Sequence, residues 1–384
     1  MQFRAGHASD AHWRAAVDVC LMQIRPVPKG ANLGFAYVSD CYHRDAPALL
    51  DYLRAQTGVD HWVGSSAVGV MGGVHEYMEQ PAVSILIGAF PGGSFQVFSG
   101  KAQLPKLGAT TGTGTGTGTG ASAAHFAVVH GDPDADDMPS LLEDMGGKVE
   151  SGFLAGGLSS ALGAQTGTRQ FADEVFSGGL SGVVFSSNVS VMTRLTQGCS
   201  VLGKAGARTI YQVTGGERNV VSMLDGRPAL DVMLEAAGAG GEGEEALRGA
   251  IAGLVIGLPV AGSDTGDYLV RNIIGVDPRN RLIAIGASVE VGMSLMFCRR
   301  SPDAARSDMG RMLESLRLQL QATPSAGLYF SCLGRGRNLF GESGVELRAI
   351  RNSLGEFPLV GFFANGEIAH DRLYAYTGVL VLFT

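Results

Sequence analysis

Cysteine is scarce in this sequence, and the few cysteines present are not arranged as metal or disulfide motifs. The 384 residues include five cysteines, and no two of them form a C-x-x-C pair. This spacing argues against a zinc ribbon, a thioredoxin-type redox motif and covalent c-type haem attachment. We therefore expect reduced thiols, most of them buried as small apolar side chains, at Cys20, Cys41, Cys199, Cys298 and Cys332.

Charged residues and long apolar runs are also in short supply. Charged residues make up 17% of the chain, and 29 lysines and arginines against 36 aspartates and glutamates leave a net charge of −7. A nucleic-acid-binding protein normally displays a basic face, which this composition does not indicate. No window approaches the roughly 18 uncharged apolar residues of a membrane span, and the N-terminal segment lacks the apolar core of a secretory signal. We expect a cytoplasmic protein that does not insert into membranes.

Proline is sparse, whereas glycine is abundant. The chain has 14 prolines and 57 glycines without a G-X-Y period, which excludes collagen. With 45% hydrophobic residues, a large globular core is available. One run of low complexity, the Thr-Gly alternation at 110–120, is predicted to be a flexible exposed loop, because glycine at every second position leaves one face without side chains to pack. A phosphate-binding loop is the alternative for this run.

Apolar periodicity predicts alternating helices and strands. A helix is expected from Trp13 to Ile24 and another from Pro47 to about Gln56, ended by Gly58. A short strand at 61–64 should run into a glycine-serine turn. The middle of the chain is rich in short strands, with a hairpin turn at Asp277–Asn280 and a long amphipathic helix from about Pro302 to Gln321.

An internal repeat organises these elements. Residues 49–71 align with residues 346–368 without a gap at an offset of 297, and both copies read helix, glycine, strand, glycine. A third, weaker copy begins at His125. A strand, a helix and a returning strand form a parallel crossover unit. We predict an α/β protein (α+β mixed) of two related domains, with mixed sheets built from repeated strand-helix-strand units.

Such a topology brings strand-end loops into one crevice, where we expect a ligand site. The segments concerned are 64–69, 332–338 and 364–368. Their glycines allow a ligand close to the backbone, and their polar groups suit a zwitterion such as an amino acid. The candidate ligand-binding residues are Ser65, Ser66, Cys332, Gly334, Arg335, Gly336, Arg337, Asn365, Gly366 and Glu367.

Two of these residue types have further interpretations. Each arginine could instead be a surface charge or an ion pair with Glu342 or Glu346, and Asn365-Gly366-Glu367 alone could be an ordinary turn. Cys332 at a strand end near arginines could have a lowered pKa and react with electrophiles or oxidants. A passive, packed thiol is the alternative.

The sequence motifs of several common catalytic sites are incomplete or missing. His75-Glu76 begins an H-E-x-x-H pattern, but Glu79 stands where the second histidine is needed. The glycine-serine segments lack the spacing of a G-x-S-x-G nucleophile elbow. Gly334-Arg335-Gly336 would need a glycine at Leu339 for a dinucleotide fingerprint, and no G-K-[ST] occurs. We expect a binding protein rather than an enzyme, with no metal site and no required cofactor.

The same residues resemble the FIST (F-box and intracellular signal transduction) family. The resemblance rests on an ordered series of short motifs, namely Gly64-Ser65-Ser66 with Gly69, Gly156-Gly157, Gln197-Gly198-Cys199, Asp225-Gly226-x-Pro228-Ala229-Leu230, Cys332-x-Gly334-Arg335-Gly336, Phe340-Gly341, Pro358 to Ile368, Tyr374 and Thr377 to Leu380. It implies a FIST N-terminal domain at 30–225 and a FIST C-terminal domain at 226–384, preceded by a helical segment at 1–29. It also implies a sensory protein that binds a small ligand, such as an amino acid or related metabolite, and signals through a separate partner protein.

Two rival functions stay open. Some family members are associated with haem and nitric oxide, which would need an axial ligand from among His75, His125, His130, His370, Cys199 and Cys332. The other rival is a protein-interaction scaffold without a ligand.

Overall fold

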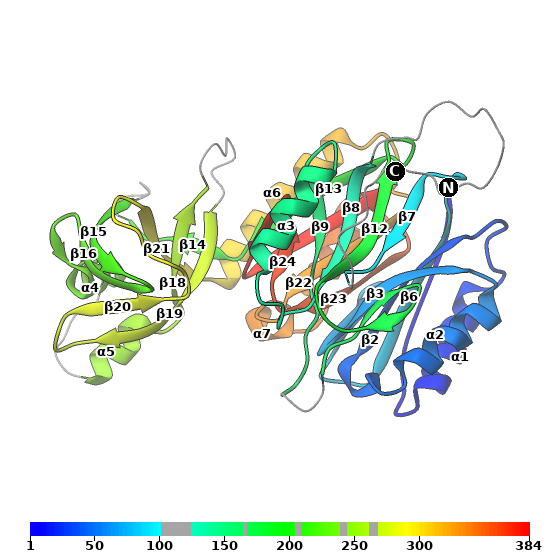
Figure 1. The fold of residues 1–384 in the computed structure, drawn as a ribbon, viewed down its shortest axis with the longest axis horizontal. Coiled ribbons are helices and arrows are strands. Elements are labelled where there is room, and N and C mark those ends of the chain that lie inside the picture. Colours follow the sequence, from blue (N-terminus) through cyan, green and yellow to red (C-terminus); the bar gives the residue numbers. More distant parts are fainter. Residues whose placement is uncertain (101–123, 164–166, 204–208, 239–243, 261–267) are drawn as a thin grey trace. The chain divides into compact units, whose positions relative to one another are not determined.

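The computed structural model describes residues 1–100, 124–163, 167–203, 209–238, 244–260 and 268–384. The Thr-Gly segment at 110–120 lies outside these residues. The chain forms two compact units, a larger one of residues Met1–Thr196 with Met309–Thr384 and a smaller one of Gln197–Asp308. Each unit is described by itself (Figure 1).

The larger unit contains three six-stranded sheets that share one design. In each, a parallel pair occupies the middle, two antiparallel strands lie on one side, and a short hairpin lies on the other. The strands are β1 (Gln2–Ser9), β2 (Leu33–Ser39), β3 (His61–Ala67), β4 (Gly69–Gly72), β5 (His75–Met78), β6 (Ala82–Ala89), β7 (Phe95–Phe98), β8 (Ala124–Gly131), β9 (Phe153–Leu158), β10 (Gln170–Ala172), β11 (Val175–Phe176), β12 (Leu180–Ser186), β13 (Val191–Gln197), β22 (Ala326–Cys332), β23 (Leu359–Ala364), β24 (Glu367–Ala369), β25 (Arg372–Tyr374) and β26 (Thr377–Phe383).

The three sheets are linked by an exchange of hairpins. The orders are β1-β6-β2-β3-β10-β11, β7-β12-β8-β9-β24-β25 and β13-β26-β22-β23-β4-β5. The hairpin that follows β3 therefore completes the sheet of β22 and β23, the hairpin after β9 completes that of β2 and β3, and the hairpin after β23 completes that of β8 and β9. Each of the three sequence repeats therefore gives its hairpin to the sheet of another repeat, in a cyclic order. No repeat forms a complete sheet by itself.

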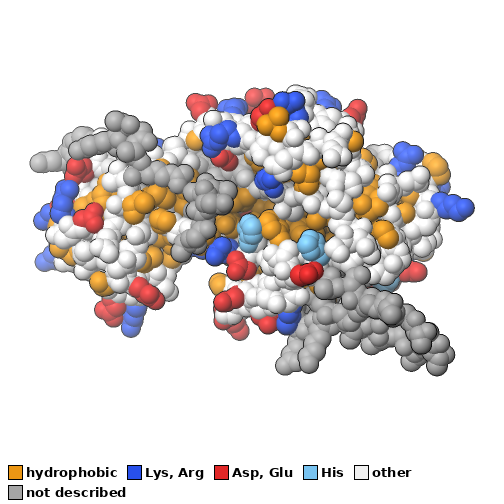
Figure 2. Space-filling model, turned by 90° about the horizontal axis from the view of Figure 1, so that it is seen from above, with side chains coloured by type: hydrophobic (Ala, Val, Ile, Leu, Met, Phe, Trp, Pro, Cys, Tyr) orange, Lys and Arg blue, Asp and Glu red, His pale blue; other side chains and the backbone are white. Residues whose placement is uncertain are grey.

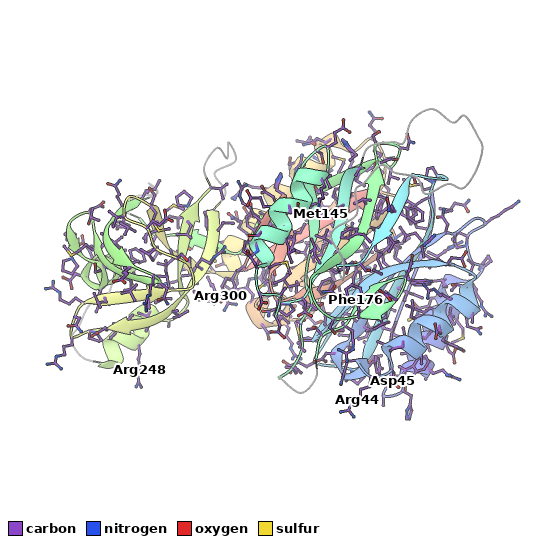
Figure 3. The ribbon with its side chains drawn as sticks, viewed as in Figure 1. Arg44, Asp45, Met145, Phe176, Arg248 and Arg300 are labelled. Atoms are coloured by element: carbon purple, nitrogen blue, oxygen red, sulfur yellow. The ribbon has the colours of Figure 1, made fainter. Side chains whose placement is uncertain are left out.

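Helices cover the outer faces of these sheets. They are α1 (Trp13–Ile24), a 3-10 turn at Asp40–Tyr42, α2 (Ala46–Thr57), α3 (Met138–Lys148), α6 (Pro302–Gln319), α7 (Arg337–Phe340) and α8 (Val345–Leu354). In Figure 1, α1 and α2 lie together beside β2, β3 and β6, and their buried faces join one apolar cluster with Ala36 and Val38. Met145, labelled on α3 in Figure 3, belongs to a second cluster, and Leu347 and Ile350 of α8 to a third.

Glycine permits the close contact between the paired parallel strands at one equivalent position per repeat. A Cβ at Gly64, Gly156 or Gly361 would lie 1.8, 1.8 or 1.7 Å from a carbonyl oxygen of the neighbouring strand. These glycines pair with Ala36, Val129 and Tyr329, which aligns the three repeats residue by residue. One residue further on, Tyr37, His130 and Phe330 occupy equivalent places, and their rings lie 5.6–6.3 Å apart where the sheets meet.

The smaller unit is an antiparallel sheet with two helices. Its strands are β14 (Cys199–Val201), β15 (Tyr211–Glu217), β16 (Val220–Leu224), β17 (Arg227–Pro228), β18 (Leu254–Pro259), β19 (Tyr268–Asp277), β20 (Leu282–Ile285) and β21 (Ser294–Arg300), and its helices are α4 (Ala229–Ala237) and α5 (Glu244–Ile251). Because β21 pairs with both β15 and β18, six of these strands close on themselves around the buried side chains of Ile256 and Phe297.

The structure confirms the α/β class and most predicted elements. Helices at 13–24, 46–57 and 302–319 match the sequence periodicity. At the predicted hairpin turn, the Asp277 carboxylate accepts hydrogen bonds from two backbone amides. The predicted turn after Gly64 is wrong, because residues 64–67 continue β3 and 69–72 form β4. Strand β1 was not predicted. Within the described residues, no helix is both long and apolar enough to cross a membrane.

Candidate functional site

The carboxyl ends of β3, β9 and β23 meet at Ser160. Its hydroxyl donates to the Phe363 carbonyl at 2.7 Å and accepts from the Val68 amide at 3.0 Å. The Leu333 amide donates to the Ala364 carbonyl at 3.0 Å, which ties the 332–338 loop to the same place. Segments that are up to about 300 residues apart in the chain therefore lie together, as strand-end loops of repeated crossover units must.

Arg335 forms a buried ion pair with Glu346 of α8. The guanidinium donates from Nε at 2.9 Å and from Nη2 at 2.7 Å to Oε1 of Glu346. Both side chains are almost completely buried, at 0% and 1% exposure. Of the interpretations that the sequence left open for Arg335, the ion pair with Glu346 is the one present, so this guanidinium is not displayed to a ligand.

The Glu346 carboxylate accepts further hydrogen bonds from the strand and loop around it. Tyr329 Oη donates at 2.7 Å, Ser331 Oγ at 2.9 Å and the Gly336 amide at 3.3 Å. Burial alone would lower the pKa of Arg335, but the Glu346 charge outweighs it and raises the pKa above its ordinary value. A buried pair is tolerated only when its polar atoms are bonded in this way. The cluster therefore holds the loop and α8 against β22.

Glu367 lies in the same region, with only half of its carboxylate bonded. Oε2 accepts from the Thr377 amide at 3.0 Å and from Thr377 Oγ1 at 2.8 Å. Oε1 is buried without a hydrogen-bond partner among the described residues. Burial, partly offset by hydrogen bonds from Thr377 and the Cys332 thiol and by the charge of Arg335, raises the pKa of Glu367 to about 8. At neutral pH this carboxyl is therefore mostly protonated, and a cationic donor would favour its ionised form.

Cys332 does not have the lowered pKa that its position near arginines suggested. Its side chain is buried beside Glu367, and burial and the Glu367 charge raise the pKa of the thiol well above its ordinary value. The nearby Arg335 opposes this only weakly, because its charge is already neutralised by Glu346. The interpretation of Cys332 as a reactive thiolate is contradicted, and the passive packed thiol is supported.

The rate at which each cysteine is labelled should depend on its burial and not on nearby arginines. Cys41 is exposed, whereas Cys20, Cys199, Cys298 and Cys332 are buried. We expect one equivalent of a maleimide to react with the native protein at neutral pH and none with Cys41→Ser. Mass spectrometry of the labelled peptides locates the site. Labelling of Cys332 in the native protein as fast as Cys41 would contradict the buried placement.

The remaining candidates divide into buried and exposed residues. Ser65 and Ser66 are fully buried in β3, with Ser65 Oγ 2.8 Å from Ser159 Oγ and Ser66 Oγ accepting from the Arg169 amide at 2.8 Å. Gly336 and Gly366 are buried, Gly334 is half-buried, and Arg337 and Asn365 are exposed. The predicted open crevice is therefore wrong in one respect, because most of its residues are enclosed.

Several residues of the cluster had no signal in the sequence. Tyr329 and Ser331 read as ordinary strand residues, Thr377 was noted only as part of a family motif, and Ser160 lies in the weakest repeat copy. Glu346 was weighed only as an arginine partner. The contacts of these residues depend on which strands end next to one another in the fold. The spacing of residues along the chain does not reveal this.

The haem candidates do not converge on one site. His130 is fully buried, its rings contact Tyr37, Phe330 and Phe362, and burial lowers its pKa to about 3. Its Nε2 lies 3.3 Å from Tyr37 Oη, so the ring is enclosed in the core. His75 on β5 and His370 in a turn are exposed, and His125 on β8 is half-buried, whereas Cys199 and Cys332 are buried.

Surface charge gives no indication of a polyanionic partner on the face seen in Figure 2. Acidic and basic side chains are interspersed there without a continuous basic area among the coloured atoms. A nucleic-acid-binding face would gather lysine and arginine.

Two family models match most of this chain. A FIST N domain model matches residues 32–227 and a FIST C domain model matches residues 229–370. An uncharacterised protein of Mycobacterium tuberculosis is 32% identical over 350 residues, which cover 89% of this chain and 88% of that protein. An uncharacterised protein of Mycobacterium bovis is 29% identical over 333 residues, covering 84% and 82%.

Proposed function

This chain belongs to the FIST family, whose domains are signal-transduction sensory domains, and we propose from this premise that it senses a small amine-bearing metabolite, such as an amino acid. The ligand's amino group would bind at Glu367. The signal would pass to a separate cytoplasmic partner protein, without catalysis.

The observation that carries the proposal is the free oxygen of Glu367. A buried polar atom without a partner is unfavourable by about 1–3 kcal/mol, so native proteins rarely retain one without a use. Here the oxygen belongs to a carboxyl of β24, which pairs with β9 of another repeat, and exposed Asn365 lies two residues away. An ammonium group would supply the missing donors and the charge that favours the ionised carboxylate.

Binding rather than catalysis is supported by how the neighbouring groups are used. Arg335 and Glu346 are bonded to each other, and the pKa of the nearest cysteine is raised. A nucleophile needs the opposite shift, and a general base needs a proton within its reach. The groups that remain suit recognition of a ligand.

Thermal unfolding with a panel of the twenty amino acids and small amines tests this function. A ligand at 100 times its dissociation constant should stabilise the protein by about 2.7 kcal/mol. Glu367→Gln should abolish the shift, because its amide cannot neutralise an ammonium group. Glu342→Gln, at an exposed carboxylate, serves as the matched control and should retain it.

Absence of stabilisation by every compound, together with a stable protein complex, would favour the scaffold alternative. Equal stabilisation of wild type and Glu367→Gln would remove Glu367 from the site.

A further inference from the structure

One turn position is equivalent in all three repeats but carries three different residues. Gly73, Asp173 and His370 directly follow the first strand of the three exchanged hairpins and have φ values of 58°, 59° and 56°. Gly73 donates its amide to the Leu359 carbonyl and Asp173 donates to the Trp62 carbonyl, both at 2.8 Å. The backbones therefore match, and only the side chains differ.

In one repeat the Asp173 side chain fills a carboxylate-binding corner. Its Oδ1 accepts from the Trp62 amide at 2.8 Å, and its Oδ2 lies 2.8 Å from His61 Nδ1. The guanidinium of Arg54 on α2 lies 3.8 Å from Oδ1, and its hydrogen bonds go to the backbone carbonyls of Asp173 at 2.5 Å and Asp60 at 3.1 Å. The corner consists of an arginine from the last turn of the helix, the Trp62 amide near the start of the returning strand, and the imidazole of His61.

The repeat that contains β23 has the arginine and the strand amide of this corner but neither the carboxylate nor the histidine, because Pro358 stands where His61 stands. Arg351 and Leu359 stand where Arg54 and Trp62 stand in the other copy, and both arginine carbonyls accept from the helix-ending glycine at 2.9 Å. Gly73 replaces Asp173. A pocket of about 280 Å³ lies here, lined by Gly73, Arg351 and Leu359 among others. Arg351 is exposed and has no ion pair among the described residues.

In the remaining repeat the position is filled by an aromatic contact. The His370 ring lies 4.0 Å from the Phe153 ring, centroid to centroid. At the pocket, glycine therefore leaves open a position that a side chain occupies in the other two repeats.

The other walls of the pocket offer polar and apolar contacts. His7 of β1 is held by a hydrogen bond of 2.8 Å between Nδ1 and Tyr77 Oη, and its Nε2 lies 3.3 Å from the place of a Cβ at Gly73. Burial and the neighbouring His75 lower the pKa of His7 to about 4, so it is a neutral imidazole at pH 7. Ile350 and Phe357 provide apolar surface, and Glu356 lies at the wall.

We propose that this pocket binds a small organic carboxylate, whose carboxylate group takes the place of the absent Asp173-type side chain against Arg351 and the Leu359 amide. The apolar body of the ligand packs on Ile350 and Phe357. A carboxylate is favoured over phosphate because the equivalent corner holds an aspartate.

This site is separate from the one proposed at Glu367. Leu359 begins β23 and Ala364 ends it, a span of about 16 Å for extended backbone, so one small metabolite does not reach both. The pocket inference stands whether or not Glu367 binds an amine.

Sodium benzoate is the probe, with propionate and inorganic phosphate as comparators, and the full-length protein is titrated. Binding is followed by the imidazole NMR signals of His7 and His75, which line the pocket. We expect saturable shifts with benzoate. Arg351→Gln should weaken binding by at least about tenfold, since a hydrogen bond to a charged group contributes about 1.5–3 kcal/mol.

Gly73→Asp is the more specific variant. Asp173 shows that aspartate adopts this backbone conformation, so the new carboxylate should occupy the corner and abolish benzoate binding. Arg348→Gln, on the same helix but paired with Glu342, is the matched control and should bind benzoate as wild type does, and so should Glu367→Gln. Unchanged binding by Arg351→Gln, retained binding by Gly73→Asp, binding of phosphate alone, or no binding of either carboxylate would each overturn the proposal.

Discussion

Glu346→Ala is expected to lower the free energy of unfolding of the larger unit by about 3–5 kcal/mol, the usual cost of removing one partner of a buried ion pair. The substitution leaves the Arg335 guanidinium buried and uncompensated, and it removes the acceptor of Tyr329, Ser331 and the Gly336 amide. The two tryptophans, Trp13 and Trp62, both lie in the larger unit, so tryptophan fluorescence during urea unfolding reports this unit alone.

A matched exposed pair provides the control for Glu346. Glu342 contacts Arg348 at 3.5 Å, with side-chain exposures of 67% and 41%. Glu342→Ala should change the stability by less than about 1 kcal/mol, because water already screens the exposed pair. The double variant Arg335→Leu/Glu346→Leu should be more stable than Glu346→Ala, since it leaves no unpaired buried charge. If Glu346→Ala cost no more than Glu342→Ala, the buried cluster would not anchor the loop.

Gly361→Ala is expected to destabilise the larger unit by at least about 4 kcal/mol, which is exceptional for the addition of one methyl group. The new Cβ would lie 1.7 Å from the Tyr329 carbonyl oxygen. A backbone carbonyl cannot rotate away as a side chain can, so β22 and β23 would have to separate. Gly64→Ala and Gly156→Ala should behave in the same way, because they are the equivalent positions of the other two repeats.

Gly310→Ala is expected to raise the free energy of unfolding, whereas Gly361→Ala should lower it. A Cβ at Gly310, in α6, meets no atom within 4 Å, and its residue is exposed. Alanine there should stabilise by about 0.5–1 kcal/mol, the ordinary difference between glycine and alanine in a helix. Urea unfolding measures all four variants. Wild-type stability of Gly361→Ala would mean that the strands are not packed as closely as described.

Much of the local structure followed from patterns along the chain. The spacing of Val17, Cys20, Leu21 and Ile24 predicts the buried face of α1, and the Asp277 turn was recognised by its residue types. The repeat at an offset of 297 pointed to the crossover units. These features depend on contacts between near neighbours, which is why composition and periodicity are sufficient for them.

The strand-end site could be predicted only in part from patterns along the chain. The topology correctly brings 332–338 and 364–368 together, but the burial of Glu367, the pairing of Arg335 and the raised pKa of Cys332 depend on side chains from other elements. A pKa follows its surroundings rather than its sequence position. Residue type alone therefore suggested a lowered pKa for a thiol whose pKa burial raises in the folded chain.

Arg54 and Arg351 show which properties the sequence determines and which depend on the tertiary structure. The sequence by itself placed both arginines at the same position of a repeated helix, before the same glycine. Only the tertiary structure decided their surroundings, because each receives its neighbour from the hairpin of another repeat. Asp173 reaches Arg54, whereas Gly73 leaves the corner beside Arg351 open. Periodicity along the chain determines the units, but the exchange of hairpins between distant units determines what each arginine meets.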